Sequence, residues 1–129
     1  MSTSYVVPEV NEPQPVAAGE VLPIASGDLP QSANEVCWPA QAEMEKQLAA
    51  AFAAEGFTLR RAHPYDAKLK HGFITNRRVG MDVFTHIHPE APIVVVEAVW
   101  QYSNHVLAGL QSHRGSILAV ANWWGQWPE

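Results

Sequence analysis

The chain has 129 residues, of which 47% are hydrophobic, and this composition is typical of one globular domain with a modest core. Its formal net charge of −5 excludes attraction to nucleic acid or to an anionic membrane by net charge alone. The single cysteine, Cys37, excludes a disulfide within the chain. No apolar run approaches the roughly 20 residues of a membrane span, and the start of the chain lacks the features of a secretory signal. We therefore expect a cytoplasmic protein with no nucleic-acid and no membrane partner.

The hydrophobic periodicity predicts four strands that alternate with three helices after an N-terminal arm. Residues 1–18 contain three prolines among polar residues, which is typical of a flexible arm or a docking arm. Pro39 suits the first turn of a helix, so the first helix is expected to begin beside it and to end at Gly56. The expected strands cover residues 21–26, 57–62, 93–99 and 117–120, and the expected helices cover residues 40–55, 76–87 and 102–113.

This alternation predicts an α/β fold in which a parallel sheet lies between two layers of helices. The expected strand order is 2-1-3-4, that of a flavodoxin-like three-layer sandwich over residues 19–129. Pro23 cannot donate to a sheet ladder, which favours an edge position or a broken strand for that segment. The fourth strand would have an open outer edge unless more chain or a partner covers it. Because no closing helix follows it, we expect a domain truncated at its C-terminus.

Unusual side chains follow the third strand, at the edge where open α/β sheets bind their ligands. Trp100 and Gln101 lie there, and the expected strand order places the loop of residues 26–28 opposite them. An indole ring stacks well on the apolar face of a sugar, and neutral amides hydrogen-bond to hydroxyl groups. Trp100 and Gln101 are therefore predicted to bind a substrate. The turn WWGQW after the fourth strand either stacks on a ligand or fills an interface, and both interpretations stay open for Trp123, Trp124 and Trp127.

Other motifs give no catalytic residue and no metal ligand in this chain. The loop SGDLPQSAN lacks both GxGxxG and GxxxxGK[ST], which is evidence against a nucleotide site. His86 and His88 form an HxH pair, but it falls at a helix end, where histidines also complement the helix dipole. The role of this pair stays open. Cys37 is interpreted as a small buried hydrophobic residue rather than as a nucleophile.

The string EAVWQYSNHVLAGLQSHRGSILAVANWWGQWP, with GDLPQSANEVCWPAQAEM upstream, resembles the N-terminal region of L-fucose isomerase-like proteins, in the fucose/arabinose isomerase family. The resemblance covers about residues 21–128. It implies a flavodoxin-like domain that caps the sugar pocket of a neighbouring subunit in a homo-oligomer, a hexamer in the intact enzyme. It also implies that Trp100 contacts a monosaccharide substrate, and that Asp28 in the loop after the first strand faces the same pocket.

The family converts aldoses to ketoses through an enediol, with Mn²⁺ held by two carboxylates and a histidine of later domains. The resemblance therefore implies the substrate-capping and subunit-assembly portion of an isomerase for sugars of the L-fucose or D-arabinose type. No cofactor is expected in this chain, whose partners would be the remaining isomerase domains or neighbouring subunits. This chain alone is expected to be inactive. The alternative is a stand-alone flavodoxin-like module that binds a small ligand or a protein without catalysis.

Overall fold

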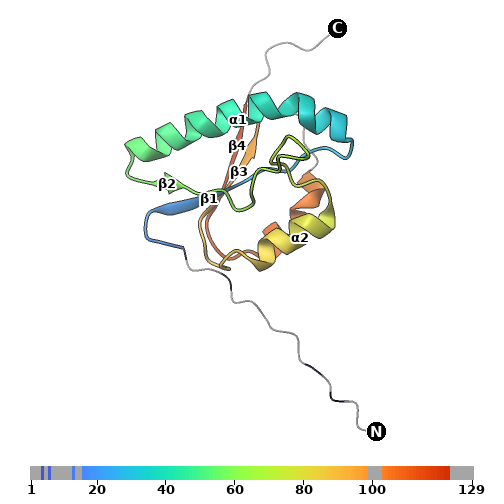
Figure 1. Ribbon diagram of the computed structural model, residues 1–129. Coiled ribbons are helices and arrows are strands. Elements are labelled where there is room, and N and C mark those ends of the chain that lie inside the picture. The colour runs from blue at the N-terminus through green and yellow to red at the C-terminus, as the bar shows by residue number, and fades with distance from the viewer. Residues whose placement is uncertain (1–3, 5, 7–12, 14–15, 99–102, 123–129) are drawn as a thin grey trace.

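The computed structural model describes residues 4, 6, 13, 16–98 and 103–122, and shows a parallel sheet with helices on both faces (Figure 1). The strands pair in the order β2-β1-β3-β4, and every pairing is parallel. The predicted flavodoxin-like α/β fold is therefore confirmed. The elements are β1 (Glu20–Ile24), α1 (Gln31–Ala54), β2 (Thr58–Leu59), α2 (Arg77–Thr85), β3 (Ile93–Glu97), the 3₁₀ helix η1 (Ser103–His105), α3 (Leu107–Ser112) and β4 (Ile117–Ala121).

Two apolar clusters hold the helices to the sheet, one on each face. On the face of α2 and α3, the buried side chains of β1 and β3 pack with Val83 of α2, with Ile87 just after that helix, and with Val106. On the other face, Val94 and Val96 pack against the apolar stripe of α1. Alternate residues of a strand point to opposite faces, so a strand that is covered on both faces is apolar throughout.

Pro23 lies inside the sheet, which corrects the expectation of an edge position and explains why β2 is short. Its register partner on β3 is Val94, and its carbonyl accepts a hydrogen bond from the Ala62 N–H on the β2 side. The ladder of β1 and β2 would next require Pro23 to donate to the carbonyl of Arg60, and proline has no N–H to donate. The regular strand consequently ends at Leu59 rather than continuing to residue 62, as the sequence pattern predicts.

Helix α1 begins at Gln31, so the prediction of a start beside Pro39 was wrong. Pro30 occupies the N-cap, and Pro39 lies inside the helix. An interior proline removes one helical hydrogen bond, here the bond to the carbonyl of Glu35. The helix continues because its residues on both sides of Pro39 are held by tertiary contacts, with Trp38 against an aromatic cluster and Gln41 buried against β3.

The later elements follow their predicted positions closely. Asn76 caps α2, and its side chain accepts a hydrogen bond from the Val79 N–H at 2.9 Å. The third predicted helix is divided into η1 and α3, and Val106 between them is buried in the core at 1% exposure. Most of the predicted arm lies outside the described residues, but Val16 at its end packs against the core cluster beneath the sheet.

Candidate functional site

Residues 25–28 form the loop that follows the carboxyl end of β1. This strand lies at the point where the strand order reverses, because β2 pairs with one side of it and β3 pairs with the other. Asn34, in the first turn of α1, fixes this loop: its Oδ1 accepts from the Asp28 N–H at 2.6 Å, and its Nδ2 donates to the Asp28 carbonyl at 2.9 Å. Gly27 allows this close approach, because a Cβ there would lie 2.4 Å from Asn34 Oδ1 and 2.6 Å from the Cβ of Phe73. The half-buried Asp28 is therefore presented at the edge of the sheet by a fixed backbone.

A buried histidine, His63, accepts a hydrogen bond from the first residue of the same loop. The Ala25 N–H donates to His63 Nε2 at 3.2 Å, which requires the neutral ring with its proton on Nδ1. Burial, and secondarily the charge of Arg61, lowers the pKa of His63 to about 3, although a backbone hydrogen bond with Gly72 opposes this shift. His63 is therefore a neutral acceptor at physiological pH and part of the scaffold of the site.

The segment of residues 63–74 is joined to the start of α1 by a second histidine and an aromatic cluster. The Phe73 N–H donates to His71 Nδ1 at 3.0 Å, so the opposite ring nitrogen carries the proton and donates to the side-chain oxygen of Gln31 at 3.0 Å. Trp38 packs edge-on against Phe73 at 5.3 Å between ring centroids, and the guanidinium of Arg61 lies 5.2 Å from the Trp38 ring. These contacts fix the segment that flanks the loop after β1.

His105 lies within electrostatic reach of two charged side chains from other elements, Asp28 in that loop and Arg77. His105 belongs to η1, after β3, and Arg77 is the first residue of α2. The backbone of η1 lies against α2, since a Cβ on Gly80 would be only 1.9 Å from the His105 carbonyl oxygen. Burial and the nearby charge of Arg77 lower the pKa of His105, while the Asp28 carboxylate acts in the opposite direction. At the carboxyl edge of the sheet, the imidazole of His105 thus lies within electrostatic reach of a guanidinium and a carboxylate.

Cys37 lies within electrostatic reach of this group, but its environment favours the thiol. Burial and the Asp28 charge raise its pKa above the ordinary value. A thiol that holds its proton is a poor nucleophile. This agrees with a packing role for the half-buried Cys37, as the sequence suggests.

Gln41 of α1 holds the carboxyl end of β3 near the same edge. Its Nε2 donates to the Val96 carbonyl at 3.1 Å, and its Oε1 accepts from the Ala98 N–H at 3.1 Å. The side chain is fully buried, so these hydrogen bonds replace water for the last backbone groups of the strand. Sequence reasoning did not find Gln41, Asn34 or His105, because their roles depend on contacts between residues distant in the chain.

The residues predicted from the sequence are only partly within the described structure. Asp28 lies in the loop after β1, at the carboxyl edge of the sheet. Trp100 and Gln101 lie outside the described residues, and so do Trp123, Trp124 and Trp127. His86 Nδ1 donates to the Asp82 carbonyl at 2.8 Å, and His88 Nδ1 accepts from the Glu90 N–H at 3.2 Å. These two exposed histidines complete the end of α2 and the turn that follows it.

The site has little capacity for a phosphate or a metal ion. The loop donors of Ala25, Gly27, Asp28 and Leu29 are all used in hydrogen bonds within the chain. A nucleotide phosphate at such a loop needs backbone N–H groups directed at the ligand. Within residues 16–98 and 103–122, no group of three or more His, Cys, Asp or Glu side chains is arranged to hold a metal ion.

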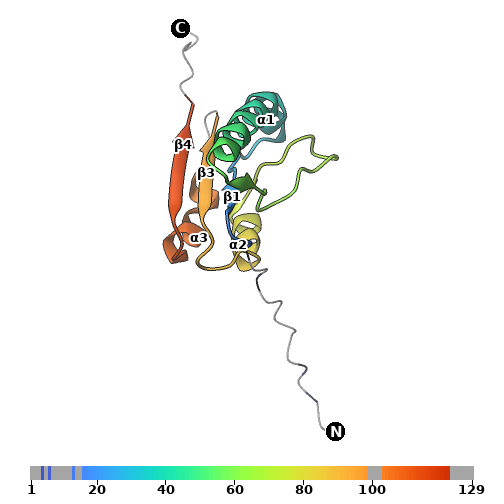
Figure 2. The ribbon, with the colours of Figure 1, turned by 90° about the vertical axis from the view of Figure 1, so that its left-hand side faces the viewer.

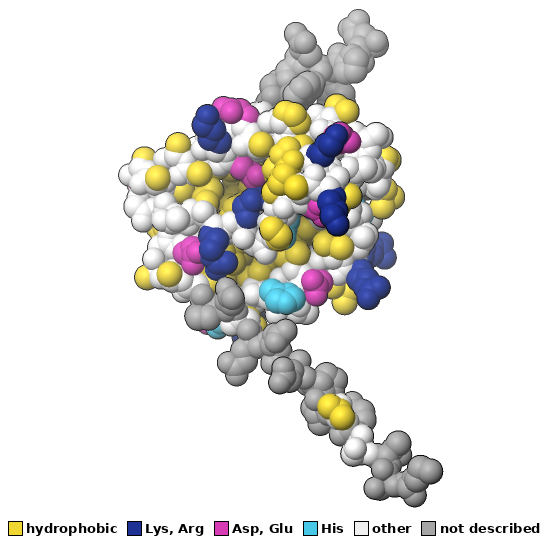
Figure 3. All heavy atoms as spheres, viewed as in Figure 1, with side chains coloured by type: hydrophobic (Ala, Val, Ile, Leu, Met, Phe, Trp, Pro, Cys, Tyr) yellow, Lys and Arg dark blue, Asp and Glu magenta, His cyan; other side chains and the backbone are white. Residues whose placement is uncertain are grey.

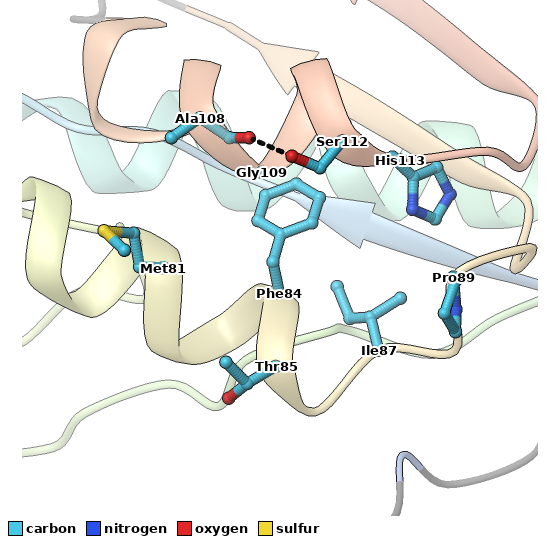
Figure 4. Close-up of a pocket in the computed structure, with 9 residues that line it drawn as sticks. All are labelled: Met81, Phe84, Thr85, Ile87, Pro89, Ala108, Gly109, Ser112 and His113. Carbon is cyan, nitrogen blue, oxygen red and sulfur yellow. Dashed lines mark hydrogen bonds between the residues drawn. The ribbon is translucent and has the colours of Figure 1, made fainter.

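A separate apolar cavity of about 370 Å³ lies between α2 and α3 (Figure 4). The ring of Phe84 projects toward Gly109 and stands edge-on to His113, with ring centroids 6.1 Å apart. The polar groups of the wall are bonded within the fold: Ser112 Oγ donates to the Ala108 carbonyl at 3.2 Å, and His113 Nε2 donates to the Ala91 carbonyl at 2.7 Å. The polar groups of this cavity wall are bonded within the fold, so the charged side chains at the sheet edge offer more to a polar ligand.

The surface of the described residues shows no concentrated charge on the face of Figure 3, where basic and acidic side chains are interspersed. Among the described residues, no helix has the length and apolar character required to cross a membrane. No protein-family model, no curated protein and no solved structure matches this chain.

Proposed function

We propose that this chain binds a small polyhydroxylated molecule, of the monosaccharide class, at the carboxyl edge of its sheet. The observation that carries the proposal is that Asp28 after β1 and Arg77 at the start of α2 both lie within electrostatic reach of His105, which follows β3 and whose backbone packs against α2. Ligands of open α/β sheets lie in this position, where the strand order reverses.

The chemistry of the group suits hydroxyl groups better than an anion. A hydroxyl both donates and accepts, so it pairs with a carboxylate acceptor such as Asp28 and with a guanidinium donor such as Arg77. A phosphate would meet the repulsion of Asp28 and a loop whose backbone donors are already used. We extend the proposal to Trp100 and Gln101, which follow β3 in the sequence and would supply a stacking surface and an amide.

In its specific form, the proposal is that the domain caps the sugar of an aldose–ketose isomerase and contributes to its subunit assembly. Transfer of a proton between C1 and C2 of a sugar needs a base of suitable pKa and an electrophile such as Mn²⁺. The residues of this chain would bind and orient hydroxyl groups, and the metal would be bound by other polypeptide. The chain is therefore proposed to bind the sugar without converting it.

Calorimetric titration of the purified chain with L-fucose and D-arabinose tests the proposal. We expect measurable binding, and loss of a hydrogen bond to a charged acceptor in Asp28→Asn should weaken it roughly tenfold or more. Asp82→Asn, an exposed aspartate of α2, is the matched control and should bind as the wild type does. Equal affinity of Asp28→Asn and wild type would refute the assignment of the site. Turnover of either sugar by this chain with Mn²⁺ would refute the non-catalytic role.

A further inference from the structure

The strand β4 forms one edge of the sheet and presents an open side (Figure 2). It pairs with β3 on one side, and no strand within the described residues pairs with its other side. The segment from Ile117 to Ala121 has the sequence ILAVA, with no charge and no proline. Natural edge strands usually carry such features because they prevent pairing with another chain. This edge has none of them, which makes it a candidate interaction surface.

The backbone of β4 has hydrogen-bonding groups directed away from the sheet at alternate residues. The Asn122 N–H donates to the Glu97 carbonyl, and the Ser116 carbonyl accepts from the Ile93 N–H. Even-numbered residues of β4 therefore direct their backbone groups to β3. The odd-numbered residues direct theirs outward, and these are Ile117, Ala119 and Ala121.

The side chains of β4 are exposed on both faces, unlike those of β1 and β3. Ile117 is 46% exposed on the face of α2 and α3, and Leu118 is 50% exposed on the face of α1. Between β4 and α1 lies a cavity of about 600 Å³, lined in part by Met44, Leu48 and Val120. Strands of a parallel sheet are normally covered on both faces, so an apolar strand exposed on both is suited to cover by another chain.

We propose that β4 pairs antiparallel with β4 of a second copy of this chain, about a two-fold axis at Ala119. Ala119 then lies opposite its own counterpart, and Ile117 lies opposite Ala121 of the other copy. All three are outward-directed residues, so each pair exchanges two backbone hydrogen bonds, and the two sheets become one continuous sheet.

The sizes of the facing side chains in this register favour a second copy of the chain as the partner of β4. Each larger side chain lies opposite a smaller one: Ile117 opposite Ala121, and Leu118 opposite Val120. A two-fold axis perpendicular to the sheet keeps both α1 helices on the same face. The two cavities between α1 and β4, whose walls combine Met44, Leu48 and Val120 with Glu43 and Gln47, then join above the new strand pair. Five residues of strand alone bury less than the ~1,000 Å² that a stable interface needs, and the joined cavities add apolar area.

The charges at the two ends of the strand favour the antiparallel arrangement. Arg114 lies just before β4, and Glu97 ends β3 beside the last residue of β4. Antiparallel pairing brings the Arg114 end of one copy to the Glu97 end of the other, whereas parallel pairing would place like ends together. This inference does not depend on the ligand proposed above.

Sedimentation velocity over a range of concentrations measures the dimerisation of the wild type and of variants with a charged residue at position 119, on the proposed two-fold axis. We expect the wild type to form dimers of twice the 14.2 kDa chain mass. Ala119→Lys and Ala119→Glu each place like charges directly opposite one another, and each should weaken dimerisation roughly fivefold or more. An equimolar mixture of the two should recover dimers, because Lys then faces Glu. Ala50→Lys on the exposed side of α1 is the matched control and should dimerise as the wild type does.

A wild type that remains monomeric at several hundred micromolar would overturn the proposal. A dimer that persists unchanged in Ala119→Lys, or a mixture of the charged variants that fails to recover dimers, would overturn it too. Far-ultraviolet circular dichroism of each variant verifies that the chain is folded, and the recovery of dimers in the mixture cannot arise from an unfolded variant.

Discussion

Acidification should destabilise this fold through His63, which accepts a hydrogen bond from the loop after β1. His63 is 8% exposed, and its pKa of about 3 lies far below the value of about 6.5 for an unfolded chain. Between these two pH values the unfolded chain binds a proton that the folded chain does not. Stability is therefore fully present above about pH 6.5 and is lost progressively as the pH falls toward 3.

The size of the effect follows from the slope of about 1.4 kcal/mol per pH unit for one proton. Between pH 7 and pH 5, His63 should account for a loss of about 2 kcal/mol in the free energy of unfolding. His71 and His105 also have pKa values lowered by burial, and their contributions have the same sign. The contribution of His63 must therefore be measured as a difference between wild type and a variant.

His63→Gln supplies that difference, because glutamine retains an acceptor for the Ala25 N–H but does not titrate. Urea unfolding followed by circular dichroism at pH 7 and pH 5 gives the loss of stability for each protein. The loss should be about 2 kcal/mol smaller in His63→Gln than in the wild type. His88→Gln, at an exposed position, controls for removal of an imidazole and should retain the loss that depends on His63. Equal losses in wild type and His63→Gln would refute the assignment of His63 as a buried neutral acceptor.

Three further substitutions test the scaffold by thermal unfolding. Gly27→Ala should destabilise by about 1–3 kcal/mol, because the new methyl group must displace Asn34 or Phe73, and wild-type stability would contradict the close approach. Gln41→Leu should cost about 2 kcal/mol or more, since it leaves backbone groups at the end of β3 without their partner, and an unchanged melting temperature would show that water replaces the amide. Pro39→Ala should stabilise by about 1 kcal/mol or more by restoring a helical N–H donor, and a loss of stability would indicate that the proline ring itself packs favourably.

The sheet could be predicted from the sequence because its signal is local. The aliphatic runs of β3 and β4, and the alternation of strands with helices, predict a parallel sheet, and its order follows the common flavodoxin-like pattern. The boundaries failed where tertiary contacts override local preference. Pro39 is typical of a helix start, but the helix continues past it because Trp38 and Gln41 on either side are held by tertiary contacts. Pro23 signals an edge, yet its missing donor only shortens the neighbouring strand.

The candidate site was predicted less completely. Asp28 follows a strand in the sequence, so its place at the sheet edge can be read from the topology alone. His105 and Arg77 have no such signal, since each reaches the edge through the packing of η1 against α2. Asn34 resembles any polar residue in the first turn of a helix until its two hydrogen bonds to Asp28 are seen.

Chemical-shift mapping of the ¹⁵N-labelled chain during titration with L-fucose or D-arabinose tests the central claim most directly. Binding at the carboxyl edge predicts saturable shifts of the amides of Asp28, Arg77 and His105, with little change at Phe84 and His113 in the cavity between α2 and α3. Shifts confined to that cavity, or no saturable shift at millimolar sugar, would contradict the claim that the sheet edge is a sugar site.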